Sequence, residues 1–366
     1  MEPEFAIVGG GVVGLSLAYG LLKKGKRVIV FDEGDGAFRA STGNFGLVWV
    51  QSKGMSEPAY ANWTRKSAAA YRGFADELTN HADLDIALVQ DGGYIIHMSE
   101  QTLDEERKRY EDLRDRLNGD YPFEVMGRNA LLAEEPNVGP KVAGALYCRE
   151  DGHLNPLRLL KALATAVRRL QGKVLNDCKV TDIVPDGSGY KLTTAMGQNF
   201  SVPKVVLSAG LGATELGPRL GFKTQIRPQQ GQVLITEKIP KLMNRPNVEV
   251  RQVNEGGVQI GASKAEAGLN NKEDLQTVAA LAKHAVDMFP KLAKTKLVRS
   301  WAVLCIMSPD GLPIYQESPD HEGVFFVTCH SGITLAAAHS EYLTDWLIGA
   351  DSTLDLSPFS EARFHV

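Results

Sequence analysis

The stretch Phe5-Ala6-Ile7-Val8-Gly9-Gly10-Gly11-Val12-Val13-Gly14 decides the fold of this chain. Its first four residues are all apolar, as in a strand buried on both faces of a parallel sheet. The glycines follow the pattern Gly-x-Gly-x-x-Gly, and a helical pattern continues to about residue 24. A second apolar strand at 27–31 completes a βαβ unit, so the N-terminus predicts an α/β, Rossmann-like domain with a parallel sheet.

The glycine spacing predicts a site for an adenine dinucleotide. Gly9 permits the tight turn, Gly11 lets the backbone approach a pyrophosphate, and Gly14 allows close packing of helix on strand. Asp32 lies 18 residues after Gly14, at the end of the second strand, where a carboxylate accepts hydrogen bonds from ribose hydroxyls. Because Asp32 would repel a 2′-phosphate, NADP is disfavoured, and FAD and NAD both stay open.

The rest of the chain predicts a second, smaller domain. At 366 residues the chain is about twice the usual domain length. Amphipathic helices are expected at 62–78, 159–170 and 275–289, and strands with hairpin character at 92–98, 173–194 and 248–263. Antiparallel hairpins inserted among βα units indicate a discontinuous domain boundary.

Composition excludes several classes of partner. A net charge of −4 offers no attraction to nucleic acid or to an anionic membrane surface. The four cysteines are widely spaced and form no Cys-x-x-Cys pair, so neither a zinc site nor a disulfide framework is predicted. No signal sequence fits before Phe5, and the longest apolar run is too short to be a transmembrane segment. We therefore expect a cytoplasmic protein.

Seven motifs in register extend the interpretation beyond the N-terminus. They are the glycine turn, Ser41-Thr42-Gly43-Asn44-Phe45-Gly46, 151–156 (Asp-Gly-His-Leu-Asn-Pro), Ser208-Ala209-Gly210, 230–232 (Gln-Gly-Gln), 308–313 (Ser-Pro-Asp-Gly-Leu-Pro) and His330-Ser331-Gly332. In this order they resemble the FAD-dependent D-amino-acid oxidase superfamily, which includes glycine oxidase, sarcosine oxidase, D-amino-acid dehydrogenases and opine oxidase subunits. The resemblance spans nearly the whole chain.

The resemblance implies an FAD-binding domain at 1–85, 145–215 and 296–366. It also implies a smaller α+β substrate-binding domain with an antiparallel sheet at 86–144 and 216–295. FAD would be bound noncovalently, with its parts distributed over four groups of residues. The ADP part would contact Gly9, Gly11, Val13, Gly14, Asp32 and Glu33, and the pyrophosphate and the flavin ring would contact Ser41, Thr42, Asn44 and Gly46. The adenine and the pyrophosphate side would contact Val180, Ala209 and Gly210, and the pyrimidine edge of the flavin would contact Gly332, Ile333 and Thr334.

The implied chemistry is hydride transfer from a carbon beside an amine to flavin N5, with oxygen or another electron acceptor regenerating the flavin. This chemistry needs no nucleophile, so we assign no catalytic side chain and no metal. His330 is the nearest polar candidate, although a loop histidine is more often satisfied by backbone. Cys305 lies two residues from the position where some relatives attach the flavin, which favours noncovalent FAD.

One departure from the family bears on the substrate. Relatives carry a carboxylate-binding arginine in a Leu-Arg-Pro stretch and another in the loop near the flavin, whereas this chain has Leu304-Cys305-Ile306 and His330-Ser331-Gly332. In the hairpin at 248–263, Glu249 falls where glycine oxidase has a substrate-side tyrosine, with Arg251 on the same face of the strand. We hypothesise that Arg251 and Lys264 replace the lost arginine; ordinary surface charges are the alternative.

These features predict an oxidase of a small amino or imino acid, with an N-substituted glycine such as iminodiacetate or sarcosine as the leading expectation. Two alternatives stay open. One is a D-amino-acid dehydrogenase that passes electrons to a quinone, and the other is the FAD subunit of a heteromeric opine or hydroxyproline oxidase, active with partner subunits.

Overall fold

The computed structural model describes residues 2–34, 40–350 and 353–364. Strand β1 (Phe5–Val8), helix α1 (Val12–Lys23) and strand β2 (Val28–Phe31) form the predicted βαβ unit. They belong to a six-stranded sheet of order β17-β18-β12-β1-β2-β8. Its other strands are β8 (Lys173–Leu175), β12 (Lys204–Leu207), β17 (Ile314–Glu317) and β18 (Val324–Thr328). All pairs are parallel except β17 with β18, which confirms the predicted Rossmann-like domain with a parallel sheet.

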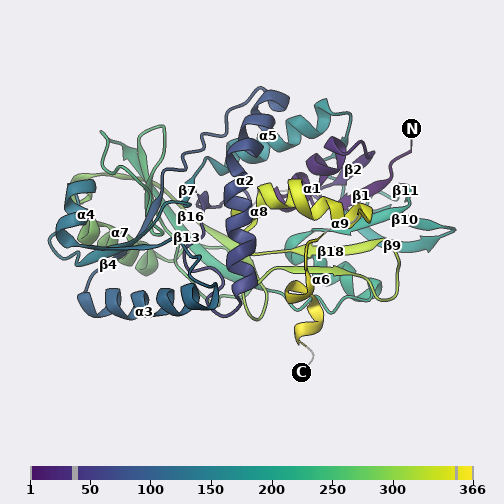
Figure 1. Ribbon diagram of the computed structural model, residues 1–366. Coiled ribbons are helices and arrows are strands. Elements are labelled where there is room, and N and C mark those ends of the chain that lie inside the picture. Colours follow the sequence, from purple (N-terminus) through teal and green to yellow (C-terminus); the bar gives the residue numbers. More distant parts are fainter. Residues whose placement is uncertain (1, 35–39, 351–352, 365–366) are drawn as a thin grey trace.

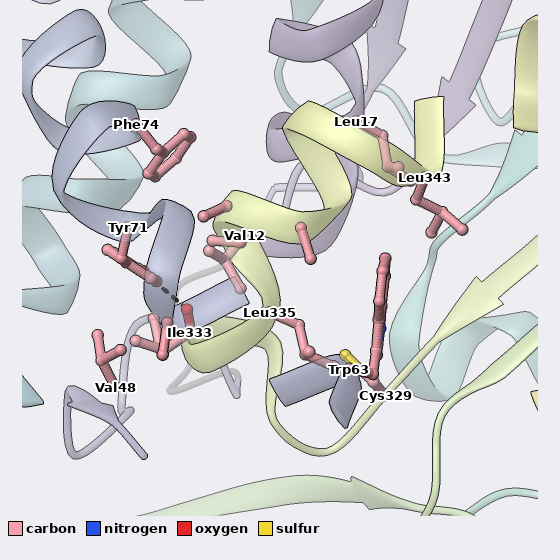
Figure 2. Packing of buried hydrophobic residues seen from close by; sticks show 14 of the residues in the cluster. Val12, Leu17, Val48, Trp63, Tyr71, Phe74, Cys329, Ile333, Leu335 and Leu343 are labelled. Carbon is pink, nitrogen blue, oxygen red and sulfur yellow. Dashed lines mark hydrogen bonds between the residues drawn. The ribbon is translucent and has the colours of Figure 1, made fainter. Parts of the chain in front are cut away.

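Helices α1, α2 (Pro58–Ala82), α5 (Pro156–Arg169) and α8 (Gly332–Ala338) pack together beside this sheet. Figure 2 shows Tyr71 and Phe74 of α2 in one apolar cluster with Val12 of α1 and Ile333 of α8. Helix α2 covers the predicted segment 62–78 and begins earlier because the Glu57 side chain accepts the Ala59 N–H and Pro58 occupies the first turn. A π-helical turn (His339–Leu343) joins α8 to α9 (Thr344–Ile348).

A small antiparallel sheet lies at one end of the molecule, opposite the end that holds α3, α4 and α7 (Figure 1). It contains β9 (Val180–Asp186), β10 (Gly189–Thr194) and β11 (Asn199–Val202). The hairpin expected over 173–194 is therefore wrong in its first part. Residues 173–175 follow α5 and pair in parallel with β2, completing a second βα crossover. A strand of three residues is too short to show which partner it takes.

The antiparallel half of the protein contains two sheets. One has the order β14-β15-β13-β16, formed by β13 (Arg227–Lys238), β14 (Val250–Gln252), β15 (Gly257–Gly261) and β16 (Leu297–Met307), and it includes the predicted hairpin at 248–263. The other contains β4 (Gly93–His97), β5 (Glu124–Gly127) and β6 (Gly144–Cys148), and a bridge from Tyr94 to Asn247 connects the two. Helices α3 (Glu100–Arg116), α4 (Arg128–Glu134) and α7 (Leu275–Met288) accompany these sheets.

The exact division into two domains stays a prediction. The sheets cross two of the expected boundaries, because β6 pairs with β4 and β16 pairs with β13. A two-stranded ladder of β3 (Leu47–Val48) and β7 (Gly152–His153) follows the Ser41–Gly46 loop, and the short α6 (Ala213–Leu216) follows β12. Among the described residues, no helix is both long and apolar enough to cross a bilayer.

Candidate functional site: a dinucleotide cleft

The glycine turn between β1 and α1 has no space for side chains. Gly9 has φ +116°, and a Cβ there would lie 2.7 Å from the carbonyl carbon of Ser208. A Cβ at Gly14 would overlap the carbonyl oxygen of Gly9 and lie 2.6 Å from Ser208 Oγ. These contacts hold α1 close to the ends of β1 and β12, which is the role that the sequence pattern predicts for both glycines.

Donors and acceptors at the start of α1 are arranged for an anion. Asp32 Oδ2 accepts the Gly10 N–H at 2.8 Å, and Ser41 Oγ accepts the Val12 N–H at 3.0 Å. In the described part of the chain, no hydrogen bond is accepted from the N–H of Gly11 or Val13. Free N–H groups at the N-terminus of a 12-residue helix form a site for a pyrophosphate.

An open cleft of about 340 Å³ runs past this turn. A smaller hollow shares Gly9, Asp32 and Ala209 with it and is closed by Val180 and Leu216. At its other end the cleft reaches Leu304 and Ile306 of β16, and Thr328 and Cys329 after β18. Ten predicted cofactor residues line these two hollows: Gly9, Gly11, Val13, Asp32, Glu33, Ser41, Thr42, Val180, Ala209 and Gly210.

The other predicted cofactor residues, Gly14, Asn44, Gly46, Gly332, Ile333 and Thr334, are not among the residues that line these two hollows. Asn44 Oδ1 accepts the Gly46 N–H at 2.8 Å, so Asn44 shapes its own loop, and Gly46 has φ +88°. Tyr71 donates to the carbonyl oxygen of Ile333 at 2.7 Å, a bond drawn in Figure 2. Thr334 Oγ1 accepts the Trp49 N–H at 3.0 Å. The Ile333 and Thr334 side chains are buried, so these two residues can offer a cofactor only their backbone.

Arg251 on β14 is 3% exposed. Its Nε donates to Gln259 Oε1 at 2.8 Å, and its Nη1 donates to the Leu154 carbonyl at 2.9 Å and lies 3.2 Å from His153 Nδ1. A Cβ at Gly46 would lie 2.7 Å from Nη2, so the guanidinium touches the Ser41–Gly46 loop. Burial lowers the pKa of Arg251, as expected for a cation whose hydrogen-bond partners are neutral.

The neighbours of Arg251 differ from the expected arrangement. Glu249 does not join it; its carboxylate instead pairs with His284 Nε2 on α7 at 3.2 Å. Lys264, the second predicted substrate residue, follows β15 and is exposed. It acts electrostatically on Lys53, on His330 and on Cys305.

Lys53 is a further basic residue that acts electrostatically on His330, and the sequence did not single it out. It is half-buried, and Lys264 and Cys329 lie within its electrostatic reach. The surrounding protein and the charges of Lys53 and Lys264 lower the pKa of His330. No family motif contains Lys53. The sequence feature that could have drawn attention to it is its position seven residues after Gly46, the last residue of the loop predicted to contact FAD.

The cleft fits FAD. It combines a turn without Cβ atoms, free N–H groups at a helix start, a carboxylate at the end of β2 and a second hollow lined in part by Val180. When bound, FAD supplies a flavin that accepts a hydride from a substrate carbon. The protein contributes the cradle for the pyrophosphate at the start of α1. This geometry defines a dinucleotide-dependent oxidoreductase.

Comparisons with known proteins give the family. The family model described as FAD dependent oxidoreductase matches residues 4–346, so the chain belongs to the FAD-dependent oxidoreductase family that includes D-amino-acid oxidase. A protein named as an opine oxidase subunit, from Agrobacterium tumefaciens (strain Ach5), is 37% identical over 100% of this chain and 98% of its own.

Two solved structures share the fold. Glycine oxidase from Geobacillus kaustophilus superposes with a TM-score of 0.90 at 27% identity, covering 98% of each chain. Iminodiacetate oxidase from Chelativorans sp. BNC1 superposes with a TM-score of 0.86 at 16% identity, covering 97% of this chain and 98% of that one. The enzyme class predicted from sequence, an FAD-dependent amino-acid oxidoreductase, is confirmed.

Proposed function

We propose that this chain is the FAD-carrying subunit of a heteromeric oxidase that acts on opines. The observation that carries this proposal is the 37% identity to the Agrobacterium opine oxidase subunit over essentially both whole chains, combined with the cleft built for FAD. It favours the heteromeric alternative over the leading expectation of an independent iminodiacetate or sarcosine oxidase. A cytoplasmic location is part of the proposal, supported by the four free cysteines.

An opine is a secondary amine in which an amino acid carries a carboxyalkyl group on its nitrogen. Its oxidation removes a hydride from the carbon beside nitrogen and a proton from the nitrogen, leaving an imine. Water then hydrolyses the imine to a keto acid and a primary amine. Iminodiacetate is a simple compound with the same arrangement of a secondary amine and two carboxylates. It was the leading expectation because two basic residues in place of the usual arginine would suit two carboxylates.

Arg251 and Lys264 are proposed to bind the substrate carboxylates. The buried guanidinium of Arg251 supports this proposal, because no carboxylate among the described residues pairs with it. Its Nε and Nη1 donate to protein acceptors, so Nη2 is the atom that would bind a substrate carboxylate. Replacing Arg251 with Met is expected to raise KM strongly. An unchanged KM in a folded, flavin-loaded variant would assign Arg251 to bracing the Gly46 loop instead.

Noncovalent attachment of FAD is also proposed. Leu304 and Ile306 line the cleft, so the side chain of Cys305 between them points to the other face of β16. Burial raises the pKa of Cys305, which keeps it a thiol. Acid precipitation should therefore release the yellow flavin into the supernatant. Colour retained in the pellet would contradict this part of the proposal.

Anaerobic bleaching of the flavin band near 450 nm tests the function. The flavin-loaded chain, alone and with its partner subunits, is mixed with opines, iminodiacetate, sarcosine and D-amino acids. We expect opines to bleach the flavin fastest and reoxidation by oxygen to need the partners. Bleaching by D-amino acids alone, or rapid peroxide formation by the isolated chain, would overturn the proposal.

A further inference from the structure

An exposed segment from the antiparallel half of the protein reaches the cofactor cleft. Residues 265–274 lie between β15 and α7, and Asn271 within this segment lines the cleft together with Leu304 and Ile306 of β16. The glycine turn that lines the same cleft follows β1 of the six-stranded sheet. Asn271 therefore brings a polar side chain from the second half of the protein to the place where FAD would lie.

Gln230 of β13 holds the middle of this segment, and only 3% of this residue is exposed. Its Nε2 donates to the carbonyl oxygen of Asn270 at 2.6 Å and to that of Lys272 at 3.1 Å. Its backbone exchanges two hydrogen bonds of 2.9 Å with Ala265, at the start of the segment. Because a buried side-chain amide keeps its hydrogen-bond partners, the backbone on both sides of Asn271 is fixed.

Gln232, two residues further along β13, holds the end of the segment and is also buried. Its Oε1 accepts the Asp274 N–H at 3.0 Å, and its Nε2 donates to Gln230 Oε1 at 3.4 Å. Asp274 is in turn the N-cap of α7, where its side chain accepts the Thr277 N–H at 2.8 Å. The two glutamines point to the same side of β13, as alternate residues of a strand do, and both fasten the segment.

The side chains of the two neighbouring asparagines are used differently. Asn270 Oδ1 accepts the Lys272 N–H at 3.0 Å, so Asn270 shapes the segment itself. The side-chain amide of Asn271, by contrast, forms no hydrogen bond with any residue in the described ranges. An asparagine amide can both donate and accept, and FAD presents acceptors on its pyrophosphate and both kinds of group on its ribityl chain. Asn271 is therefore suited to a hydrogen bond with bound FAD.

We propose that Asn271 is a cofactor-binding residue, and that Gln230 and Gln232 are positioning residues that hold it against bound FAD. Segment 265–274 then covers part of the cofactor, and the Gln-Gly-Gln motif at 230–232 acts on FAD through this segment. The inference goes beyond the proposed function, because it concerns how the cofactor is held. It rests on FAD occupying the cleft and not on the identity of the substrate.

Titration of the FAD-free chain with FAD, followed by flavin fluorescence, measures the effect of each residue. Asn271→Ala should weaken FAD binding roughly 2- to 10-fold, as for one lost hydrogen bond. Gln230→Met keeps the size of the side chain but cannot donate, and it should weaken binding to a similar extent. In the double variant the two losses should not add, because Gln230 acts through Asn271. Losses that add in full would show that Gln230 does not position Asn271 and would overturn the inference.

Leu269→Ala is the matched control and should leave the Kd for FAD unchanged, because Leu269 is 75% exposed in the same segment and does not line the cleft. Hydrogen exchange gives a second measurement: FAD should slow exchange of the amides at 265–274 in the wild-type chain. This measurement and the exposed Asn271→Ala variant suffice if Gln230→Met does not fold. Wild-type FAD affinity in Asn271→Ala, or exchange at 265–274 that FAD does not slow, would refute the inference. If opines still bleach the flavin in that case, the proposed function stands and only the role of this segment falls.

Discussion

Replacing Gly14 with Ala tests whether close packing of α1 on β1 creates the cofactor site. The added Cβ would lie 2.6 Å from Ser208 Oγ, closer still to the Gly9 carbonyl oxygen and 3.1 Å from Ile7 Cγ2. A backbone oxygen cannot rotate away, so α1 must shift outward and carry the free N–H groups of Gly11 and Val13 with it. Overpacking of this kind costs about 1–3 kcal/mol.

At about 1.4 kcal/mol per tenfold change, that cost corresponds to FAD binding weakened by roughly 5- to 150-fold. The assay is titration of the FAD-free chain, followed by flavin fluorescence, with unfolding in urea measured in parallel. Gly73→Ala is the control, since Gly73 lies in α2 with no atom within 4 Å of an added Cβ. It should leave the Kd unchanged and stabilise the helix by about 0.5–1 kcal/mol. Wild-type FAD affinity in Gly14→Ala would refute the packing argument.

Two further predictions concern buried polar groups. Tyr315→Phe removes the hydroxyl that accepts from Trp63 Nε1 at 3.0 Å and bonds His339 Nε2 at 2.8 Å, so urea unfolding should show a loss of about 2–4 kcal/mol. Tyr342→Phe, which removes a hydroxyl without a hydrogen bond to the described residues, should change stability by less than about 0.5 kcal/mol; equal losses would contradict the assignment. Burial raises the pKa of Asp151 to about 7, above its unfolded value, so its contribution to stability is present below about pH 4 and is lost as pH rises through 7. Asp151→Asn should therefore flatten the fall of the unfolding free energy between pH 4.5 and 7.5, and an identical slope in both proteins would show that another group titrates.

Local patterns predicted the nucleotide-binding half of the protein well. The alternation of apolar strand, glycine turn and helix is set by neighbours in sequence, so β1, α1 and β2 were predictable within a residue. The strand at 173–175 was not, because three residues carry too little pattern to distinguish a parallel edge strand from one arm of a hairpin. Its partner β2 lies more than 140 residues earlier.

The sequence predicted the substrate-binding residues less completely than the nucleotide-binding ones. The sequence indicated that arginines were missing at two family positions, and it suggested Arg251 and Lys264 as replacements. It did not suggest Lys53, since no motif contains this residue. Nor did it show that Glu249 pairs with His284, because that contact joins the residue before β14 to α7, 35 residues later.

The sequence by itself determined the class of protein: a glycine turn with a carboxylate at the end of the next strand has few uses other than holding a dinucleotide, and that chemistry is local. Only the tertiary structure decided which charged residues come within electrostatic reach of one another. Lys53, Lys264 and His330 are separated by 66 residues or more, and the free energy of bringing like charges together depends on distances that no sequence spacing records.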